Sequence, residues 1–286
     1  MAVLEGLKTA EFQALRWLEA PLASREVLSL AHDPAHVALV LDRFGPAAAA
    51  TGMVQIEMDT FMSPGSAEAA LRAAGACVAA VDLVVAGGAH NAFCAIRPPG
   101  HHAEKIQSMG FCLFNNLAVG ALHARARHGF RRVAVVDFDV HHGNGTQDIF
   151  WNDPDLFYAS SHEFPLYPGT GSASETGVAG NIVNAPLPPG GGSAEFREAF
   201  ESRIFPELAA FAPEFVFISA GFDGHLADPL ADLRLDAADF AWATAGLCRI
   251  AAESAGGRVV SALEGGYDLE ALRRSSAAHV RALMEA

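Results

Sequence analysis

The stretch VVDFDVHHG, residues 135–143, indicates both the fold and the chemistry of this chain. An apolar, β-branched run, which is typical of a buried strand, ends here in four ionisable side chains. Side chains of an extended segment alternate between its two faces, so we expect Asp137, Asp139 and His141 to lie on one side. Two carboxylates and an imidazole that converge on one point repel one another or hold a cation. The stretch therefore predicts a metal site and an enzyme.

Three predicted strands end in unusual polar groups. The carboxyl ends of the strands form the ligand crevice of an open parallel α/β sheet, so topology alone should bring these groups to one edge. A loop with two adjacent histidines, His101 and His102, follows a Pro-Pro-Gly turn and adds side chains that point in different directions. The strands and their polar groups are Val133–Val136 with Asp137, Phe215–Ser219 with Asp223, and Val259–Leu263 with Glu264–Tyr267.

Strands and helices alternate along the chain, which predicts an α/β fold: an open parallel sheet with helices on both faces, in three αβα layers. We expect a single catalytic domain over residues 1–286. The segment Pro168–Gly192 is rich in Gly, Pro and Ser, and we interpret it as a long functional loop because chemically important residues lie on both sides. The expected helices are 66–87, 116–128, 193–212, 236–255 and 268–286, with helical segments in 1–50, and the expected strands are 93–97, 132–138, 156–160, 214–219 and 258–263.

Composition excludes some classes of function. The formal charge is −14, from 19 Lys and Arg against 33 Asp and Glu, which argues against nucleic-acid binding. It favours cationic partners only weakly, because an acidic surface commonly serves solubility. The four cysteines are scattered and predict free thiols in a reducing cytoplasm. No long uncharged apolar run is present, and residues 1–20 lack a signal-peptide core, so we expect a cytoplasmic protein without membrane contact.

The motifs resemble the histone deacetylase superfamily, which includes acetylpolyamine amidohydrolases and acetoin-utilisation proteins. Asn144 follows His-His-Gly, as in the class II branch, where class I members usually have Asp. The matching strings run in family order from about residue 60 to the end. They are RPPGHHA (97–103), GFCLFNN (110–116), VVDFDVHHGNGTQ (135–147), YPGTG (167–171), SAGFDGHLADPL (219–230) and LEGGYDL (263–269).

The resemblance implies an arginase-like α/β fold and a zinc-dependent amidohydrolase. Such an enzyme removes acetyl or short acyl groups from lysine side chains or related N-acyl amines, supplied as peptides or small molecules. The residues that match the family's metal ligands are Asp139, His141 and Asp223, with one zinc ion per chain. Two carboxylates and one imidazole leave an open position for water and substrate, as a catalytic zinc requires.

The resemblance also implies catalytic roles for five residues. His102 matches the general base and acid, with Asn144 as its orienting partner. His101 matches a second histidine that the family pairs with an aspartate, here Asp137, and a carboxylate partner keeps an imidazolium charged. Tyr267 matches the residue whose hydroxyl binds the developing oxyanion.

Further matches imply a narrow acyl tunnel and a structural potassium site. Phe111 and Tyr167 would form the tunnel walls, whereas His142 would be structural. The residues expected to contact substrate are Gly110, Phe111, Tyr167, Leu230, Gly265 and Gly266. The residues that match the potassium site are Asp137, Asp139, His141 and Ser160, although the residues themselves give no independent sign of potassium.

The beginning of the chain departs from the family pattern. Family members usually open with an edge strand and a His-Pro-Glu-Arg-Pro-like motif before the helix that residues 1–20 resemble, and this motif is absent here. A shortened chain, a misassigned start and cover by another subunit are all open interpretations, and the last would make the protein a homo-oligomer.

Several alternatives to a lysine deacetylase stay open. Polyamine-selective members carry a glutamate seven residues after the metal aspartate, and Leu230 stands there in this chain, which favours a neutral acyl amine. The acidic surface nevertheless keeps acetylpolyamines open as substrates. A binuclear manganese ureohydrolase of the arginase kind would need Asp-x-His-x-Asp in place of Asp-x-Asp-x-His. A catalytically silent metal- and acyl-lysine-binding protein would be expected to lack His102 or Tyr267, and both are present.

Overall fold

The computed structural model describes residues 1–286 and is built around one parallel sheet. Its six strands lie in the order β3-β8-β7-β4-β5-β6, and every neighbouring pair is parallel. A separate antiparallel pair of two-residue strands lies in the N-terminal third of the chain. The strands are β1 (Val54–Gln55), β2 (Phe61–Met62), β3 (Asn91–Cys94), β4 (Val133–Asp137), β5 (Leu156–Glu163), β6 (Ile182–Leu187), β7 (Phe215–Ala220) and β8 (Val259–Leu263).

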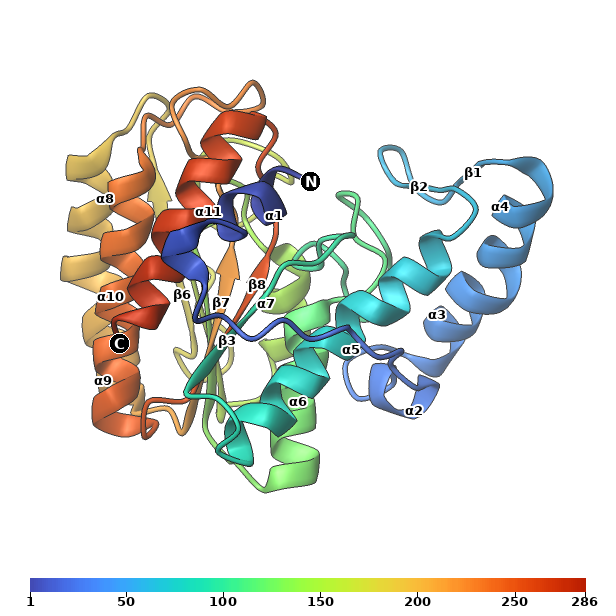
Figure 1. The fold of residues 1–286 in the computed structure, drawn as a ribbon, viewed down its shortest axis with the longest axis horizontal. Coiled ribbons are helices and arrows are strands. Elements are labelled where there is room, and N and C mark those ends of the chain that lie inside the picture. Colours follow the sequence, from blue (N-terminus) through green and yellow to red (C-terminus); the bar gives the residue numbers. More distant parts are fainter.

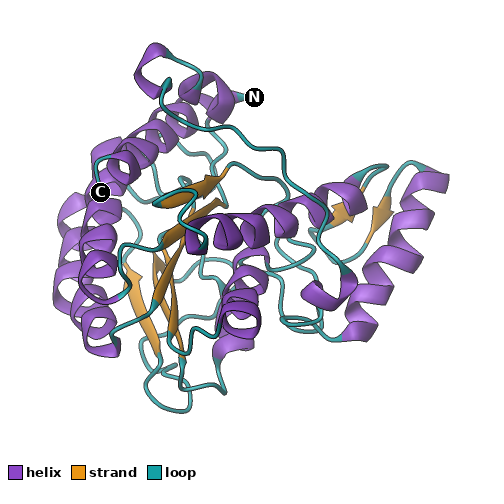
Figure 2. Cartoon of the chain, turned by 60° about the horizontal axis from the view of Figure 1, so that its bottom comes forward, coloured by secondary structure: helices purple, strands orange, loops and turns teal.

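Helices cover both faces of the sheet, which gives the expected three-layer αβα architecture (Figures 1 and 2). One layer consists of α1 (Ala2–Leu7), α8 (Ser193–Ala199), α9 (Phe205–Phe211), α10 (Ala237–Ser254) and α11 (Leu269–Met284). The other consists of α5 (Ser66–Val85), α6 (Asn116–His128) and α7 (Asn144–Phe150). Beside this second layer, α2 (Arg25–Leu28), α3 (Pro34–Ala38) and α4 (Gly45–Thr51) form a lobe with β1 and β2, and shorter helical turns are η1 (Ala10–Phe12), η2 (Leu39–Phe44) and η3 (Phe200–Ile204).

The apolar run that precedes the acidic motif is buried on both faces of the sheet. Val133 and Val135 of β4 belong to the core beneath α5 and α6, whereas Ala134 and Val136 belong to the core beneath α8–α11. A parallel strand covered on both faces is apolar along its whole length, because neither face meets water. Burial of each valine side chain stabilises the fold by about 1.5–3 kcal/mol.

Local capping explains why several helix boundaries agree with the sequence prediction. The side chain of Asn115 accepts a hydrogen bond from the Ala118 amide at 3.0 Å, and α6 ends before Gly129, whose φ is 77°. Asp268 caps α11 in the same way, with its side chain 2.8 Å from the Ala271 amide. Capping side chains and a left-handed glycine satisfy the backbone groups that a helix leaves free at its ends.

The prediction that Pro168–Gly192 is a loop throughout is wrong, because β6 lies within it. β6 pairs with β5 and forms one edge of the sheet, where Pro186 is tolerated since a proline cannot donate to a further strand. The strand expected at 93–97 is also displaced, because β3 begins at Asn91 and ends at Cys94. Turn-forming residues on either side of a short edge strand obscured both boundaries.

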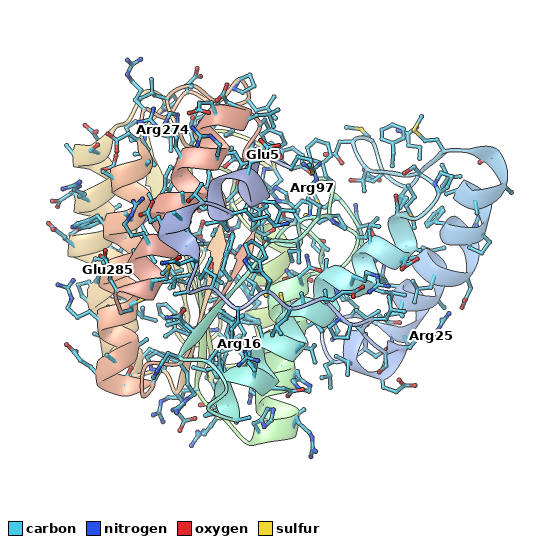
Figure 3. The ribbon with its side chains drawn as sticks, viewed as in Figure 1. Glu5, Arg16, Arg25, Arg97, Arg274 and Glu285 are labelled. Atoms are coloured by element: carbon cyan, nitrogen blue, oxygen red, sulfur yellow. The ribbon has the colours of Figure 1, made fainter.

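At the opposite edge of the sheet, the segment 14–21 lines a cavity together with β3. This segment, α1, α11, the end of α5 and β3 enclose a mostly apolar cavity of about 520 Å³. Arg16 fastens the segment by donating to the Gly88 carbonyl at 3.0 Å, and Figure 3 shows Arg16 where the chain crosses in front of the sheet. None of the helices is both long enough and apolar enough to cross a membrane.

Candidate active site

The sheet topology places two polar loops side by side at the carboxyl ends of the strands. From β4 the chain moves outward to β5 and β6, and it then crosses back to β7 on the other side of β4. The loops that follow β4 and β7 therefore start from neighbouring strands, with Asp137 opposite Ser219 in the register. This is the switch point at which open α/β sheets bind ligands.

Asp139, His141 and Asp223, here called the buried cluster, meet at this point. The Nδ1 atom of His141 lies 3.1 Å from Asp139 Oδ1 and 3.1 Å from Asp223 Oδ2. Asp139 and Asp223 are almost completely buried. The three residues each direct a donor atom to one point, and these atoms lie within 4.8 Å of one another.

The expectation that an extended segment aligns these side chains is wrong, because β4 ends at Asp137. The chain then turns, and two hydrogen bonds between residues two positions apart hold the turns in place. Asp137 Oδ1 accepts from the Asp139 amide at 3.0 Å, and Asp139 Oδ1 accepts from the His141 amide at 2.9 Å. Aspartate side chains commonly stabilise such turns by binding the backbone two residues further along. Convergence therefore comes from turns and not from strand alternation.

The electrostatics of the buried cluster favour a positive charge between its carboxylates. Burial, reinforced by the charge of Asp139, raises the pKa of Asp223 to about 6. Burial alone would lower the pKa of His141, but its hydrogen bonds to the two carboxylates raise it to about 11. A proton shared in this way occupies the place that a divalent cation could take. Two carboxylates and one imidazole with an open side suit a catalytic zinc ion.

Two neighbouring histidines face the buried cluster and have different partners. His101 Nδ1 lies 3.0 Å from Asp137 Oδ2, and His102 Nδ1 lies 2.8 Å from Asn144 Oδ1. The amide of Asn144 is oriented by Glu104, whose Oε1 accepts from Nδ2 at 2.7 Å. With the Asn144 oxygen facing His102, the network assigns a hydrogen to His102 Nδ1 and leaves Nε2 without one.

The two histidines are driven to opposite charge states. Burial lowers the pKa of His101, but the charges of Asp139 and Asp137 and the bond to Asp137 outweigh it and raise this pKa to about 10. Burial and the positive charge of His101 hold the pKa of His102 well below its usual value. The ring centroids are 4.0 Å apart, so the charge of one ring acts directly on the other. The site thus pairs an imidazolium with a neutral imidazole.

Glu264 supports the histidine loop, although the sequence analysis assigned it no role. Its Oε2 atom accepts from the amides of Gly100 at 2.6 Å and His101 at 3.1 Å. Burial raises the pKa of Glu264 to about 7. Behind His101, the hydroxyl of Tyr158 donates to Asp137 Oδ2 at 3.2 Å. The position of Glu264 directly after a buried strand was the available signal.

Tyr267 lies in the loop after β8, where Asp228 holds its backbone. Asp228 Oδ2 accepts from the Tyr267 amide at 2.7 Å, and no role had been assigned to Asp228 from sequence. Burial and the charges of Asp223 and Asp139 raise the pKa of Tyr267, so its hydroxyl stays a donor. Gly265 donates its amide to Asp139 Oδ2 at 2.8 Å, and a Cβ there would collide with both carboxylates of the buried cluster.

These loops enclose a cavity of about 230 Å³. Gly110 is required in its wall, because its φ is 56° and a Cβ would collide with the His102 ring. The hairpin that carries β1 and β2 holds this wall: Asp59 Oδ1 accepts from the Gly110 amide at 3.1 Å, and Thr60 Oγ1 accepts from the Phe111 amide at 3.0 Å. The lining residues are Asp59, Pro99, His101, His102, Gly110, Phe111, Asp139, His141, Leu166, Tyr167, Leu230, Gly265 and Tyr267.

The cavity brings together ten of the residues proposed from sequence, and the others lie behind it or elsewhere. Asp137, Asn144 and Asp223 support the lining side chains from behind. Gly266 does not line the cavity and lies beside Leu272 and Phe222. Asp59, Pro99 and Leu166 also line the cavity but were not proposed from sequence: Asp59 and Leu166 lie outside the matching strings, and Pro99 was assigned only to the turn before the histidines. Asp59 and Thr60 could have been found only by knowing that their hairpin folds over residues 110–111.

Ser160 and His142 lie deeper than the cavity. Ser160 is buried on β5 opposite Asp137 in the register, and its hydroxyl is 2.8 Å from His162 Nδ1. Potassium binding there stays a prediction. Burial lowers the pKa of His142 to about 3, and its ring bonds to Thr170 at 2.8 Å and Gln147 at 3.0 Å.

Comparisons with known proteins agree with this arrangement. Residues 1–283 match the family described as "Histone deacetylase domain". The chain is similar to "Histone deacetylase 14, chloroplastic" of Arabidopsis thaliana, with 42% identity over 92% of this chain and 64% of that protein. It is also similar to "Histone deacetylase-like amidohydrolase" of Pseudomonas aeruginosa, with 42% identity over 88% of this chain and 66% of that protein.

A solved structure described as the HDA15 HD domain superposes with a TM-score of 0.91 at 37% identity, and the match covers 99% of this chain and 80% of that one. The chain spans slightly less than two thirds of the length of the two relatives named above. The extent of the family match and the level of identity place the chain in the histone deacetylase family.

Proposed function

We propose that the chain is a zinc-dependent deacetylase that hydrolyses acetyl or short acyl amides of lysine side chains or related amines. The observation that carries this proposal is the convergence on one cavity of the buried cluster and two histidines with different partners, His101 bonded to Asp137 and His102 bonded to Asn144. Amide hydrolysis needs a base for water, an acid for the leaving amine and stabilisation of negative charge. The residues that face this cavity can supply all three.

Asp139, His141 and Asp223 would hold the zinc ion. When bound, zinc supplies Lewis-acid chemistry, since it polarises an amide carbonyl and lowers the pKa of water. The chain supplies ligand atoms that are shielded from water and fixed in position. Both carboxylates are buried, and each accepts a backbone hydrogen bond, Asp139 from Gly265 and Asp223 from Val140.

The remaining chemistry belongs to side chains of the chain itself. His102 Nε2 accepts the proton of the attacking water and then delivers it to the nitrogen of the leaving amine. Asn144 keeps the other proton of this ring on Nδ1, so that the base presents the correct nitrogen. His101 remains an imidazolium and stabilises the developing negative charge. The hydroxyl of Tyr267 donates to the former carbonyl oxygen as it becomes an oxyanion.

The shape of the cavity supports a linear acyl amine as the substrate class. Phe111 and Tyr167 stand at the mouth, with 48% and 38% of their surfaces exposed, and Leu230 adds an apolar side chain. An acyl-lysine chain is apolar along its methylenes and fits between such walls. Acetylpolyamine remains a second candidate, because the carboxylate of Asp59 also lines the cavity and attracts cations.

A turnover panel tests the proposal. The zinc-loaded protein is assayed on acyl-lysine peptides, acylpolyamines and aryl acetamides, together with its Tyr267→Phe variant. We expect turnover by the natural chain, and a decrease of about 10²–10³-fold in Tyr267→Phe with unchanged zinc content. No turnover on the whole panel would favour a silent binding protein, and normal turnover by Tyr267→Phe would refute the oxyanion role. Release of urea from arginine would indicate a ureohydrolase.

A further inference from the structure

A second group of metal-ligating side chains lies far from the cavity, on α5 and α6. Asp82 of α5 faces His123 and His128 of α6, and these three residues are here called the helix-end cluster. The Nε2 atoms of His123 and His128 lie 2.8 Å and 2.6 Å from the same oxygen, Oδ1 of Asp82. The two imidazoles meet edge to face with centroids 5.5 Å apart. Three donor atoms from two helices therefore converge on one point.

The position of the helix-end cluster in the fold adds a negative field. α5 and α6 each precede a strand of the same parallel sheet, so they run in the same direction, and both descend toward the lower edge of Figure 1. Asp82 lies in the last turn of α5, which ends at Val85, and His128 is the last residue of α6. The carbonyl ends of two parallel helices thus point toward the cluster, and such ends attract cations.

The three side chains are partly buried, so an ion in solvent can reach them while the surrounding helices restrict their movement. The side chain of Asp82 is 52% exposed, whereas those of His123 and His128 are only 11% and 21% exposed. The two imidazole rings are packed against the helices, and the carboxylate of Asp82 lies on the side of the cluster that faces solvent. An ion could enter from solvent and keep water on its open positions.

We propose that Asp82, His123 and His128 form a second metal site, which takes a divalent first-row transition ion such as Zn²⁺. The two imidazole nitrogens are borderline ligands that suit this class, whereas Ca²⁺ and Mg²⁺ prefer a shell made of oxygen ligands alone. Tetrahedral zinc–ligand bonds of ~2.0–2.1 Å place neighbouring ligand atoms about 3.3 Å apart. The distances from the two histidine Nε2 atoms to Asp82 Oδ1 therefore need to lengthen only to about this value. The bound ion cross-links the ends of α5 and α6.

The site is tested by counting zinc in the full chain and in matched variants. After dialysis against zinc at pH 7.5, we expect two equivalents in the natural chain and one in Asp223→Asn, where only the helix-end cluster is intact. His128→Ala and His123→Ala should each lose one equivalent, with affinity at the cluster reduced at least about tenfold. His90→Ala removes an exposed histidine outside the cluster and should retain two.

Two further measurements exclude a simple Asp–His ion pair. In the Asp223→Asn background, zinc should raise the unfolding temperature, and adding His128→Ala should abolish that rise, because only the folded form binds. Zinc binding should weaken as the solution is made more acidic, because protons compete with the metal ion for its ligand atoms.

The proposal is overturned if Asp223→Asn binds no zinc, or if its bound zinc survives both histidine substitutions in a chain that circular dichroism shows to be folded. Its failure is separable from failure of the proposed function. A natural chain whose single zinc disappears in His128→Ala but persists in Asp223→Asn would support the helix-end cluster and count against zinc in the cavity.

Discussion

The buried cluster and the helix-end cluster use the same two kinds of side chain, but they differ in what surrounds them. Asp139 and Asp223 accept backbone hydrogen bonds, and they lie near His101 and the other polar side chains of the cavity. The helix-end cluster has only its own three side chains and the helix ends. The difference teaches that convergence of ligands can create a metal site, whereas catalysis also needs a base, an acid and an oxyanion donor placed by their own partners.

The largest effect should follow from removing a ligand in the buried cluster. Asp223→Asn should abolish measurable turnover and the zinc bound at the cavity, because a neutral amide oxygen is a much weaker ligand for zinc than a carboxylate. Asp82→Asn makes the same chemical change in the helix-end cluster and should leave turnover unchanged. Zinc content and deacetylation rate are measured on both variants. Equal losses of activity would break the comparison, since the two clusters would then act together.

A smaller but severe effect is expected from the proposed base. His102→Gln should lower kcat by about 10²–10⁴-fold, which is the usual contribution of general acid–base catalysis. Its zinc content should stay unchanged, because His102 is not among the ligands. His123→Gln serves as the matched change in the other cluster and should affect zinc binding there but not kcat. An active His102→Gln enzyme would remove His102 from the mechanism.

The partners that orient the base should matter less than the base itself. Asn144→Ala removes the acceptor of the His102 Nδ1 hydrogen and should lower kcat about 10–100-fold with little change in KM. Asn144→Asp restores an acceptor and should recover most of this loss. The kcat and KM values of both variants decide the point. If the Asp variant is as slow as the Ala variant, packing and not orientation explains the effect.

The smallest effect concerns stability at the helix-end cluster without metal. Burial acts to raise the pKa of Asp82, but the combined bonds from His123 and His128 outweigh it and lower this pKa. The folded-state pKa lies below the unfolded value of 3.8, so the stabilisation is present above that pH and is lost as pH falls through the folded value. Asp82→Asn should therefore reduce the free energy of unfolding by about 0.2–1 kcal/mol at pH 6. The difference between the urea titrations of the two chains should shrink as the pH falls below 3.8, and a difference that does not shrink would contradict an ionic origin.

The sequence predicted the layers and most strands of the sheet, because these depend on local patterns, whereas the family resemblance implied which residues meet at its edge. The apolar run before Asp137, Gly129 after α6 and the capping residue Asp268 indicate a strand and two helices without any tertiary information. The strand β6 was not predicted, because its proline and the surrounding glycines are typical of a loop. Only its pairing with β5 makes this segment a strand.

The residues of the candidate site that lie in sequence motifs were predictable. The residues of distant segments that hold them in place were not. Asp59 and Thr60 act on residues 110 and 111 through a hairpin whose placement no local pattern reveals. The helix-end cluster escaped for the same reason. Asp82 and His128 lie 46 positions apart on different helices, and they meet only because α5 and α6 pack side by side.

The segment beside β3 has a consequence for solution behaviour. The segment 14–21 forms one wall of a mostly apolar cavity of about 520 Å³ beside the edge strand β3, and Arg16 fastens the segment to Gly88. An uncovered edge strand offers free backbone groups to other chains, and an apolar wall beside it adds to their attraction. A chain trimmed to begin at residue 22 would therefore tend to aggregate, even though its ligands and histidines are complete. We therefore expect residues 1–21 to limit aggregation, and a recombinant protein made for assay or crystallisation should retain them.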